Sequence, residues 1–382
     1  MDILNSAFSA GFGLLSYVIP ALFVLMIVVF FHELGHFLVG RWCGVTIKTF
    51  SIGFGSELFG FHDKHGTRWK ISMIPLGGYV KFLGDENAAS TPDFDALQQM
   101  DEEESKGALQ NKPLWARAAI VAAGPFANFL LSIVIFAMML LLYGKPITPA
   151  RIDSVVPGSA AEEAGFQVGD VMLSVDGAKI ETFSDVQSVV ALSSNETLEV
   201  VVDRGGQEVT LMTTPRRTEV TDQFGNKQKI GVLGIRHEAK PEDVVRKRFG
   251  PVEAMWGGVE ETYFIVKHTL GYIARIFVGK EDADQLGGPI RVAQVSGQVA
   301  TLGIVALVNL SAMLSVSIGL INLFPIPMLD GGHLVFYAIE AVRGRPLSEK
   351  SQELGFRIGM ALVFSLMIFA TFNDITRIFL SN

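Results

Sequence analysis

Three residues near the N-terminus have the types and the spacing that suit metal chemistry. The stretch VVFFHELGHFLVG, residues 28–40, contains His32, Glu33 and His36 in the order H-E-x-x-H. On a helix, His32 and His36 lie one turn apart on a single face, so both imidazoles can reach one zinc ion. Glu33 then lies beside the ion and can take a proton from an attacking water. The pattern predicts two metal ligands and one general base.

This motif lies at the end of a long apolar run that begins near Tyr17. Ionisable side chains inside a membrane span are costly and persist mainly where they pair, line a water cavity or bind an ion. Two histidines that are only hydrogen-bonded within a helix bundle are the alternative. The spacing favours the metal site.

A catalytic zinc site usually has three protein ligands and one open position, so a third ligand is needed. The stretch GLINLFPIPMLDGGH, residues 319–333, ends another apolar run. Pro325 and Pro327 must break that helix, and Gly331-Gly332 allows a sharp turn that places Asp330 on irregular backbone at membrane depth. Asp330 is the favoured third ligand; an N-cap of the following helix is the alternative role.

Four further polar or small residues accompany these motifs. His333 is a rival ligand, but its place after the double glycine favours a local hydrogen bond. Asn322 could hold a substrate backbone or bond a neighbouring helix. In AAGPFANFLLS, Gly124 and Asn128 predict a face for close helix packing, and contact of Asn128 with the site is the lesser alternative.

The composition indicates an integral membrane protein. Of 382 residues, 49% are hydrophobic and only 18% are charged, and the mean hydropathy is positive. The net charge of -8 and the absence of a basic stripe with aromatic residues exclude nucleic acid as a partner. The single cysteine, Cys43, excludes a disulfide framework and a cysteine-rich metal site.

About 20 apolar residues cross a bilayer as a helix, and four runs reach that length. Lys and Arg gather between the first and second runs and between the third and fourth runs, which predicts that both loops face the cytoplasm and both termini lie outside. The N-terminus lacks the pattern of a removable signal peptide, so the first helix is expected to stay. The predicted spans are residues 17–40, 116–143, 302–325 and 356–379.

The fold class predicted from these features is a polytopic α-helical membrane protein with about four transmembrane helices and two extramembrane parts. Alternation and glycines in residues 48–85 predict β-hairpins at the membrane surface on the cytoplasmic side. Short β-branched runs alternate with helical stretches in the external segment, as in an α+β domain. The predicted divisions are 1–143, the external domain 144–240, an amphipathic interfacial helix with a linker in 241–300, and 301–382.

The external segment resembles a PDZ domain, most clearly in PGSAAEEAGFQVGDVMLSVDG. This resemblance implies binding of peptide tails by strand addition, with a passive spacer as the alternative.

The motifs taken together resemble the site-2 protease family of intramembrane metalloproteases, and in particular its bacterial branch, typified by the regulator of sigma-E protease. The stretches that carry the resemblance are HELGHF, GFGSELFG, IPLGGYVKFLGD, AGPFANF and NLFPIPMLDGGH, in this order. The resemblance implies Zn²⁺ as cofactor, with His32, His36 and Asp330 as ligands and Glu33 as general base. It also implies that Asn322 assists substrate binding and that the hairpin around Gly77, Gly78 and Tyr79 holds the substrate as an added strand.

The resemblance further implies a place in the bacterial inner membrane, with the active site near the cytoplasmic side. The expected substrate is a transmembrane helix of a single-span protein that another protease has already trimmed, such as an anti-sigma factor or a remnant signal peptide. The typical protease has two tandem PDZ domains, whereas this chain shows one copy, with GVLGIRHEA (231–239) as a possible trace of a second.

The expected function is thus a zinc endopeptidase that acts within the membrane. The alternative is a non-proteolytic membrane scaffold that binds peptide tails through its PDZ-like domain. A metal transporter is less favoured, because the polar groups converge on one depth and form no path across the membrane.

Overall fold

The structure, a computed structural model, describes residues 2–87, 92–147, 150–221, 227–238, 245–279 and 287–380. The chain divides into two compact units. The first consists of Met1–Met138, Met255–Thr269 and Leu286–Ile378, and the second of Met139–Ala254, Leu270–Gln285 and Phe379–Asn382.

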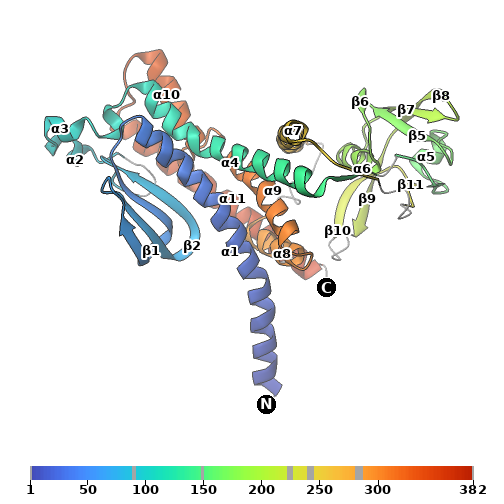
Figure 1. The fold of residues 1–382 in the computed structure, drawn as a ribbon, viewed down its shortest axis with the longest axis horizontal. Coiled ribbons are helices and arrows are strands. Elements are labelled where there is room, and N and C mark those ends of the chain that lie inside the picture. Colours follow the sequence, from blue (N-terminus) through green and yellow to red (C-terminus); the bar gives the residue numbers. More distant parts are fainter. Residues whose placement is uncertain are drawn as a thin grey trace. The chain divides into compact units, whose positions relative to one another are not determined.

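Four long apolar helices dominate the first unit (Figure 1). The parts of them that are long and apolar enough to cross a membrane are Leu15–Trp42, Leu114–Tyr143, Ile304–Asn322 and Glu349–Arg377. The four runs expected from the sequence are therefore found as four such helices in the described part of the chain. The complete helices are α1 (Asp2–Trp42), α4 (Leu114–Tyr143), α9 (Ile304–Asn322) and α11 (Glu349–Leu380).

The third of these helices ends earlier than its hydropathy suggests. Helix α9 stops at Asn322, and Pro325 and Pro327 lie in the irregular stretch before α10 (Asp330–Arg343). Asp330 is consequently the first residue of a helix, and the expectation that it lies on irregular backbone was wrong by one residue.

The double glycine of this segment serves a different purpose from the predicted turn. Gly331 and Gly332 lie within the first turn of α10. A β-carbon at Gly331 would come within 2.2 Å of the Phe324 carbonyl oxygen, and one at Gly332 within 2.4 Å of the Ile326 carbonyl oxygen. The glycines let the helix start directly against the preceding loop, so the expected sharp turn is replaced by close backbone approach.

Small residues bring α1, α4 and α9 into close contact. A β-carbon at Gly35 of α1 would lie 2.3 Å from the Ala123 carbonyl oxygen of α4, and one at Gly319 of α9 would lie 3.1 Å from the Pro125 carbonyl oxygen of α4. The Ser132 hydroxyl of α4 donates to the Ala312 carbonyl of α9 at 2.8 Å. Backbones that approach this closely allow hydrogen bonds between apolar helices.

Other helices, wholly or in part, complete the first unit. Asp374 of α11 accepts hydrogen bonds from the Gly288 and Arg291 amides at the start of α8 (Pro289–Ala300), at 3.0 Å each. Gly297 of α8 lies directly against Tyr17 of α1. Helix α7 (Pro251–Phe277) contributes Gly258, which packs against the α4 backbone at Ile133. The remaining short helices are α2 (Phe94–Gln99), α3 (Glu102–Ser105) and the 3₁₀ turn η1 (Leu109–Asn111).

The predicted hairpin is formed by two long bent strands, β1 (Ile47–His62) and β2 (Arg68–Phe82), beside α1 (Figure 1). Each strand folds over near its middle, so residues 49–52 pair with both 78–81 and 68–71. Residues 68–72 pair in turn with 57–62. The segment 78–82 therefore forms one edge of a small antiparallel sheet.

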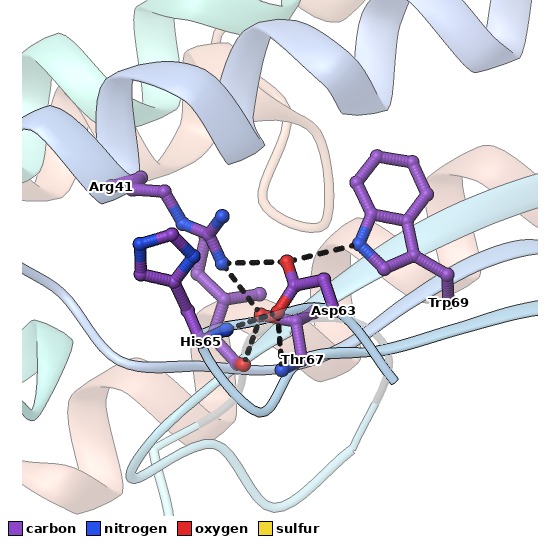
Figure 2. A network of polar contacts seen from close by, with 6 residues as sticks. Arg41, Asp63, His65, Thr67 and Trp69 are labelled. Carbon is purple, nitrogen blue, oxygen red and sulfur yellow. Dashed lines mark hydrogen bonds and ion pairs between the residues drawn. The ribbon is translucent and has the colours of Figure 1, made fainter. Parts of the chain in front are cut away.

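A polar network ties the turn of this hairpin to the end of α1 (Figure 2). Arg41 donates to the Asp63 carboxylate at 2.8 Å and to the Thr67 hydroxyl at 3.0 Å, and the Trp69 indole donates to Asp63 at 3.2 Å. Partial burial alone would raise the pKa of Asp63, but the hydrogen bonds from Arg41, His65, Thr67 and Trp69 lower it to about 2. The hairpin is thus anchored on the helix that carries His32 and His36.

The second unit is a small α+β structure with its own apolar core. A four-stranded antiparallel sheet has the order β6-β5-β7-β8, and α5 and α6 pack against its strands. Fully buried residues such as Ile152, Val175 and Val200 form the core. The elements are β3 (Lys145–Ile147), β4 (Ser154–Val155), α5 (Ala160–Glu163), β5 (Val171–Val175), β6 (Ala178–Lys179), α6 (Phe183–Leu192), β7 (Leu198–Arg204), β8 (Gln207–Thr213), β9 (Arg216–Thr221), β10 (Lys227–Val232), β11 (Ile235–Arg236) and β12 (Val245–Lys247).

Candidate metal centre

The structure brings His32, His36 and Asp330 together, although 294 residues separate His36 from Asp330 in the chain. The Nε2 atoms of the two histidines are 3.2 Å apart. One Asp330 oxygen lies 3.2 Å from His32 Nε2, and the other lies 3.5 Å from His36 Nε2. Both histidines are buried, each with 9% of the residue's surface exposed. Three good zinc ligands therefore converge on one point in an apolar bundle.

The spacing of the donor atoms is compatible with one zinc ion. With zinc–ligand distances of about 2.0–2.2 Å, two ligand atoms at a tetrahedral angle are about 3.3–3.6 Å apart. The two histidine Nε2 atoms, 3.2 Å apart, are close to this range, and one donor atom from each of the three residues lies within 4.8 Å of the others. Three protein ligands also leave one position open, as catalytic zinc sites require.

The orientation of His36 also fits a metal ligand. Its Nδ1 donates to the Ile120 carbonyl of α4 at 2.8 Å, which leaves the Nε2 lone pair free to face Asp330 and His32. A ligating histidine usually donates its second ring nitrogen in this way, because the hydrogen bond fixes its tautomer and orientation.

A glycine on α4 makes room for both rings. A β-carbon at Gly124 would lie 2.2 Å from His36 Nε2, 2.5 Å from His36 Cε1 and 2.9 Å from His32 Cε1. Side chains larger than hydrogen are thus incompatible with the two imidazoles at this position. The face of α4 that contains Gly124 and Asn128 is a close packing face, as predicted, and it packs against His32 and His36 of α1.

Glu33 lies beside the histidines and against the sheet edge. A β-carbon at Gly78 would be 3.1 Å from Glu33 Cγ, and the Val80 backbone forms a hydrogen bond with the Glu33 carboxylate. Glu33 also lines a cavity of about 390 Å³ together with His32, His36 and Asp330. A general base in this position can reach water held in the cavity.

Two of the four predicted substrate-binding residues line the cavity. Tyr79 of β2 and Asn322, the last residue of α9, both line it. Gly78 is the neighbour of Tyr79 and touches Glu33, whereas Gly77 lies against the Phe54 ring, with φ of 120°. Asn322 and Tyr79 thus face the same space as Glu33, and Gly77 shapes the bend of β2 beside it.

His333, the rival ligand, is not part of the cluster of three. It lines the same cavity and packs against the rings of Phe336 and Phe356. Burial lowers the pKa of His333. The expected local hydrogen bond is replaced by aromatic packing.

Asp330 follows strained backbone, and its helix is fixed by a partly buried ion pair. Met328, two residues earlier, has φ of 89°, a conformation that costs a residue with a β-carbon about 1–3 kcal/mol. The Asp330 side chain faces the histidines, and the N-cap of α10 is Leu329 without a side-chain bond. Further along α10, Glu340 forms a two-point ion pair with Arg117 of α4. The helix that begins with Asp330 is therefore fixed to the helix that contacts both histidines.

Sequence reasoning did not assign Ile120 and Gly124 to the site, and it gave Asn128 only a lesser role. These residues are spaced by four and share one face of α4, and each meets a histidine of α1. The four-residue spacing was visible in the sequence, but the partner of that face was not.

Comparisons with known proteins agree with this geometry. The sequence profile of Peptidase family M50 matches residues 20–366. The chain belongs to peptidase family M50. The predicted membership of the site-2 protease family is thereby confirmed.

Relatives of this M50 peptidase align over nearly their whole length. A protein of Agrobacterium fabrum named as a zinc metalloprotease is 52% identical over 98% of this chain and 100% of its own. Another of Rhizobium meliloti is 50% identical over 96% of this chain and 98% of its own. The metalloprotease MmpA of Caulobacter vibrioides is 42% identical over 96% of each chain.

One solved structure, the PDZ domain of an SdrC-like protein from Listeria monocytogenes, covers 25% of this chain and 88% of its own at 14% identity, with a TM-score of 0.18. That likeness is too low to bear on the fold.

Family and relatives establish the class of activity. The protein is a zinc-dependent metalloendopeptidase, and the described part of its chain has four helices long and apolar enough to cross a membrane. The non-proteolytic scaffold considered from the sequence is thereby set aside.

Proposed function

We propose that this peptidase cleaves a peptide bond within the transmembrane helix of a single-span membrane protein. The observation that carries the proposal is the position of His32, His36 and Asp330 between the apolar helices, with Glu33 beside them. Ionisable groups at such a depth are expensive unless they bind an ion or line a water-filled space. A site built there is suited to a substrate that lies in the membrane itself.

In this mechanism, His32, His36 and Asp330 hold the zinc ion. When bound, zinc supplies Lewis acidity that polarises the scissile carbonyl and lowers the pKa of the attacking water. Glu33 removes a proton from that water and later delivers it to the leaving amine. The cavity that Glu33 lines holds the water needed for hydrolysis.

The substrate is proposed to unwind and to pair with the edge segment 78–82. Among the described residues this segment pairs with a strand on one side only, residues 47–52, and Glu33 of α1 forms a hydrogen bond with its Val80 backbone. A peptide added there exchanges backbone hydrogen bonds with the sheet while its carbonyl approaches the metal centre. Asn322, on the cavity wall, is proposed to bond the substrate backbone.

The remaining proposals concern location and partners. The positive charges of residues 44–113 and 344–357 support cytoplasmic loops and outward termini in a bacterial inner membrane. The second unit is proposed to be PDZ-like and to bind peptide tails of trimmed substrates, which would include anti-sigma factors and remnant signal peptides. Reporter fusions after residues 143 and 348 test the topology, because only the first should report the outer face.

The activity is tested by replacing Glu33 with Gln in the purified protein. We expect cleavage of a single-span substrate in proteoliposomes to fall by about 10²–10⁴-fold, the usual contribution of a general base, while zinc content is unchanged. Glu57→Gln is the matched control, since Glu57 pairs with Arg68 on the hairpin and does not line the cavity. Cleavage that survives in Glu33→Gln would refute the mechanism.

Substrates are found by comparing membrane-protein fragments from cells with wild-type and Glu33→Gln protein. Fragments that end within a predicted span and that are lost in the variant identify the class. If only soluble-domain fragments change, the intramembrane assignment is wrong.

A further inference from the structure

Asn128 has a position that neither helix packing nor the ligand set explains. Its side chain is fully buried on α4, and its Nδ2 lies 3.2 Å from His32 Nδ1. Its Oδ1 is buried and has no hydrogen-bond partner among the described residues. The Asn128 backbone carbonyl accepts from the Ser132 and Ser315 hydroxyls at 2.9 Å each, which fixes this turn of α4 against α9.

The protonation of His32 decides which amide atom should face it. As a metal ligand, His32 must offer the lone pair of Nε2, the atom that lies 3.2 Å from both His36 Nε2 and Asp330. In a neutral imidazole the proton is then on Nδ1, and this N–H needs an acceptor. A half-turn of the Asn128 amide presents Oδ1 to Nδ1, and it breaks no hydrogen bond of Oδ1.

His36 shows the same arrangement one turn away. Its Nδ1 donates to the Ile120 carbonyl, eight residues before Asn128 on the same face of α4. Gly124 lies midway between them and admits both rings. One face of α4 thus meets the outer nitrogen of both imidazoles, by a backbone oxygen for His36 and by a side-chain amide for His32.

We infer that Asn128 is a positioning residue for the metal centre: its side-chain oxygen accepts the Nδ1 proton of His32 and holds Nε2 toward the zinc ion. The inference rests on the proposed ligand role of His32. Because such partners fix the tautomer and the ring orientation of a ligand, their loss usually lowers metal affinity by about 10–100-fold.

The test measures zinc affinity in Glu33→Gln protein, which contains a complete ligand set and does not cleave itself or its neighbours. Zinc is titrated against a chelator of known affinity in detergent. We expect Asn128→Leu, similar in shape but without an acceptor, to bind zinc about 10–100-fold more weakly. We expect Asn128→Asp to stay within about threefold of the parent, because a carboxylate accepts the same proton.

Ser315→Ala is the matched control. It removes a hydrogen bond to the Asn128 backbone oxygen and leaves the side chain that faces His32 unchanged. Its zinc affinity should equal that of the parent, even if its melting temperature falls. If Asn128→Leu does not fold, as judged by circular dichroism, Asn128→Ala takes its place in the same titration.

Two results overturn the inference. The first is unchanged zinc affinity in Asn128→Leu, and the second is equal weakening in Asn128→Leu and Asn128→Asp, which would mean that the position matters only for packing. His32→Ala separates this outcome from a failure of the metal site. If His32→Ala also retains zinc, the proposed ligand set is wrong; if it loses zinc while the Asn128 variants keep it, only the role of Asn128 is refuted.

Discussion

Replacing Gly124 with alanine adds one carbon atom and tests how closely α4 approaches the histidines of the metal centre. The new β-carbon would lie 2.2 Å from His36 Nε2, whereas ordinary van der Waals contact begins near 3.4 Å. Either the imidazole or helix α4 must therefore move by about 1.2 Å. His36 is also bonded to Ile120, one turn before Gly124, so the ring cannot turn away without losing that hydrogen bond.

The size of the effect follows from that displacement. A misplacement of about 1 Å in a catalytic group costs roughly 100-fold in rate. We therefore expect kcat/KM to fall at least about 100-fold, which corresponds to about 2.7 kcal/mol of transition-state stabilisation. Zinc content after dialysis should fall as well, because the ligand itself moves.

The assay compares cleavage of a transmembrane peptide in detergent with bound zinc measured by atomic absorption. Gly271→Ala is the matched control, because Gly271 is helical and a β-carbon there meets nothing within 4 Å. That control should keep full activity and gain up to about 1 kcal/mol in helix stability. If Gly124→Ala keeps more than half of the activity and all of its zinc, the close approach of α4 to the histidines is wrong.

Two further predictions concern the hairpin. Because the pKa of Asp63 is lowered to about 2 in the folded protein, its contribution to stability is complete above its ordinary pKa of 3.8 and is lost as the pH falls toward 2. Asp63→Asn should therefore lower the free energy of unfolding by about 1–2 kcal/mol at pH 7, after allowance for solvent screening. Its melting temperature, measured by circular dichroism, should depend less on pH between about 4 and 2 than that of wild type. Identical pH profiles would contradict the network in Figure 2. If substrates pair with the edge segment 78–82, only every second backbone amide of a substrate peptide donates to the sheet. N-methylation of one amide should therefore raise KM about 3–10-fold at alternate positions only, since a net hydrogen bond contributes about 0.5–1.5 kcal/mol. KM values without this alternation would argue against strand addition.

Much of the site could be predicted because residue spacing within one motif determines which side chains share a helix face. His32 and His36 share a helix face by spacing alone, and the shortage of one ligand pointed to a carboxylate such as Asp330. The prolines that end α9 also had their expected effect. The spacing alone did not show which helix or strand packs against each helix face.

The roles of Gly124 and Asn128 depend on which side of α4 meets α1, and that choice is made by packing between segments nearly 100 residues apart. The same holds for Gly331 and Gly332, whose close approach to the loop before them has no signature in the sequence that separates it from a turn. The double pairing of residues 49–52 also escaped prediction, because irregular register in both strands bends the sheet back on itself.

The long separation between His36 and Asp330 has a consequence for the timing of synthesis. Asp330 is the 294th residue after His36, and a ribosome that adds about 5–20 residues per second needs roughly 15–60 seconds to reach it. During that interval the two histidines lack their carboxylate partner, and α10 is not yet bound to α4 through Glu340 and Arg117. A newborn chain therefore lacks the complete set of proposed ligands, and peptidase activity that depends on this set begins only when synthesis of the chain is nearly complete.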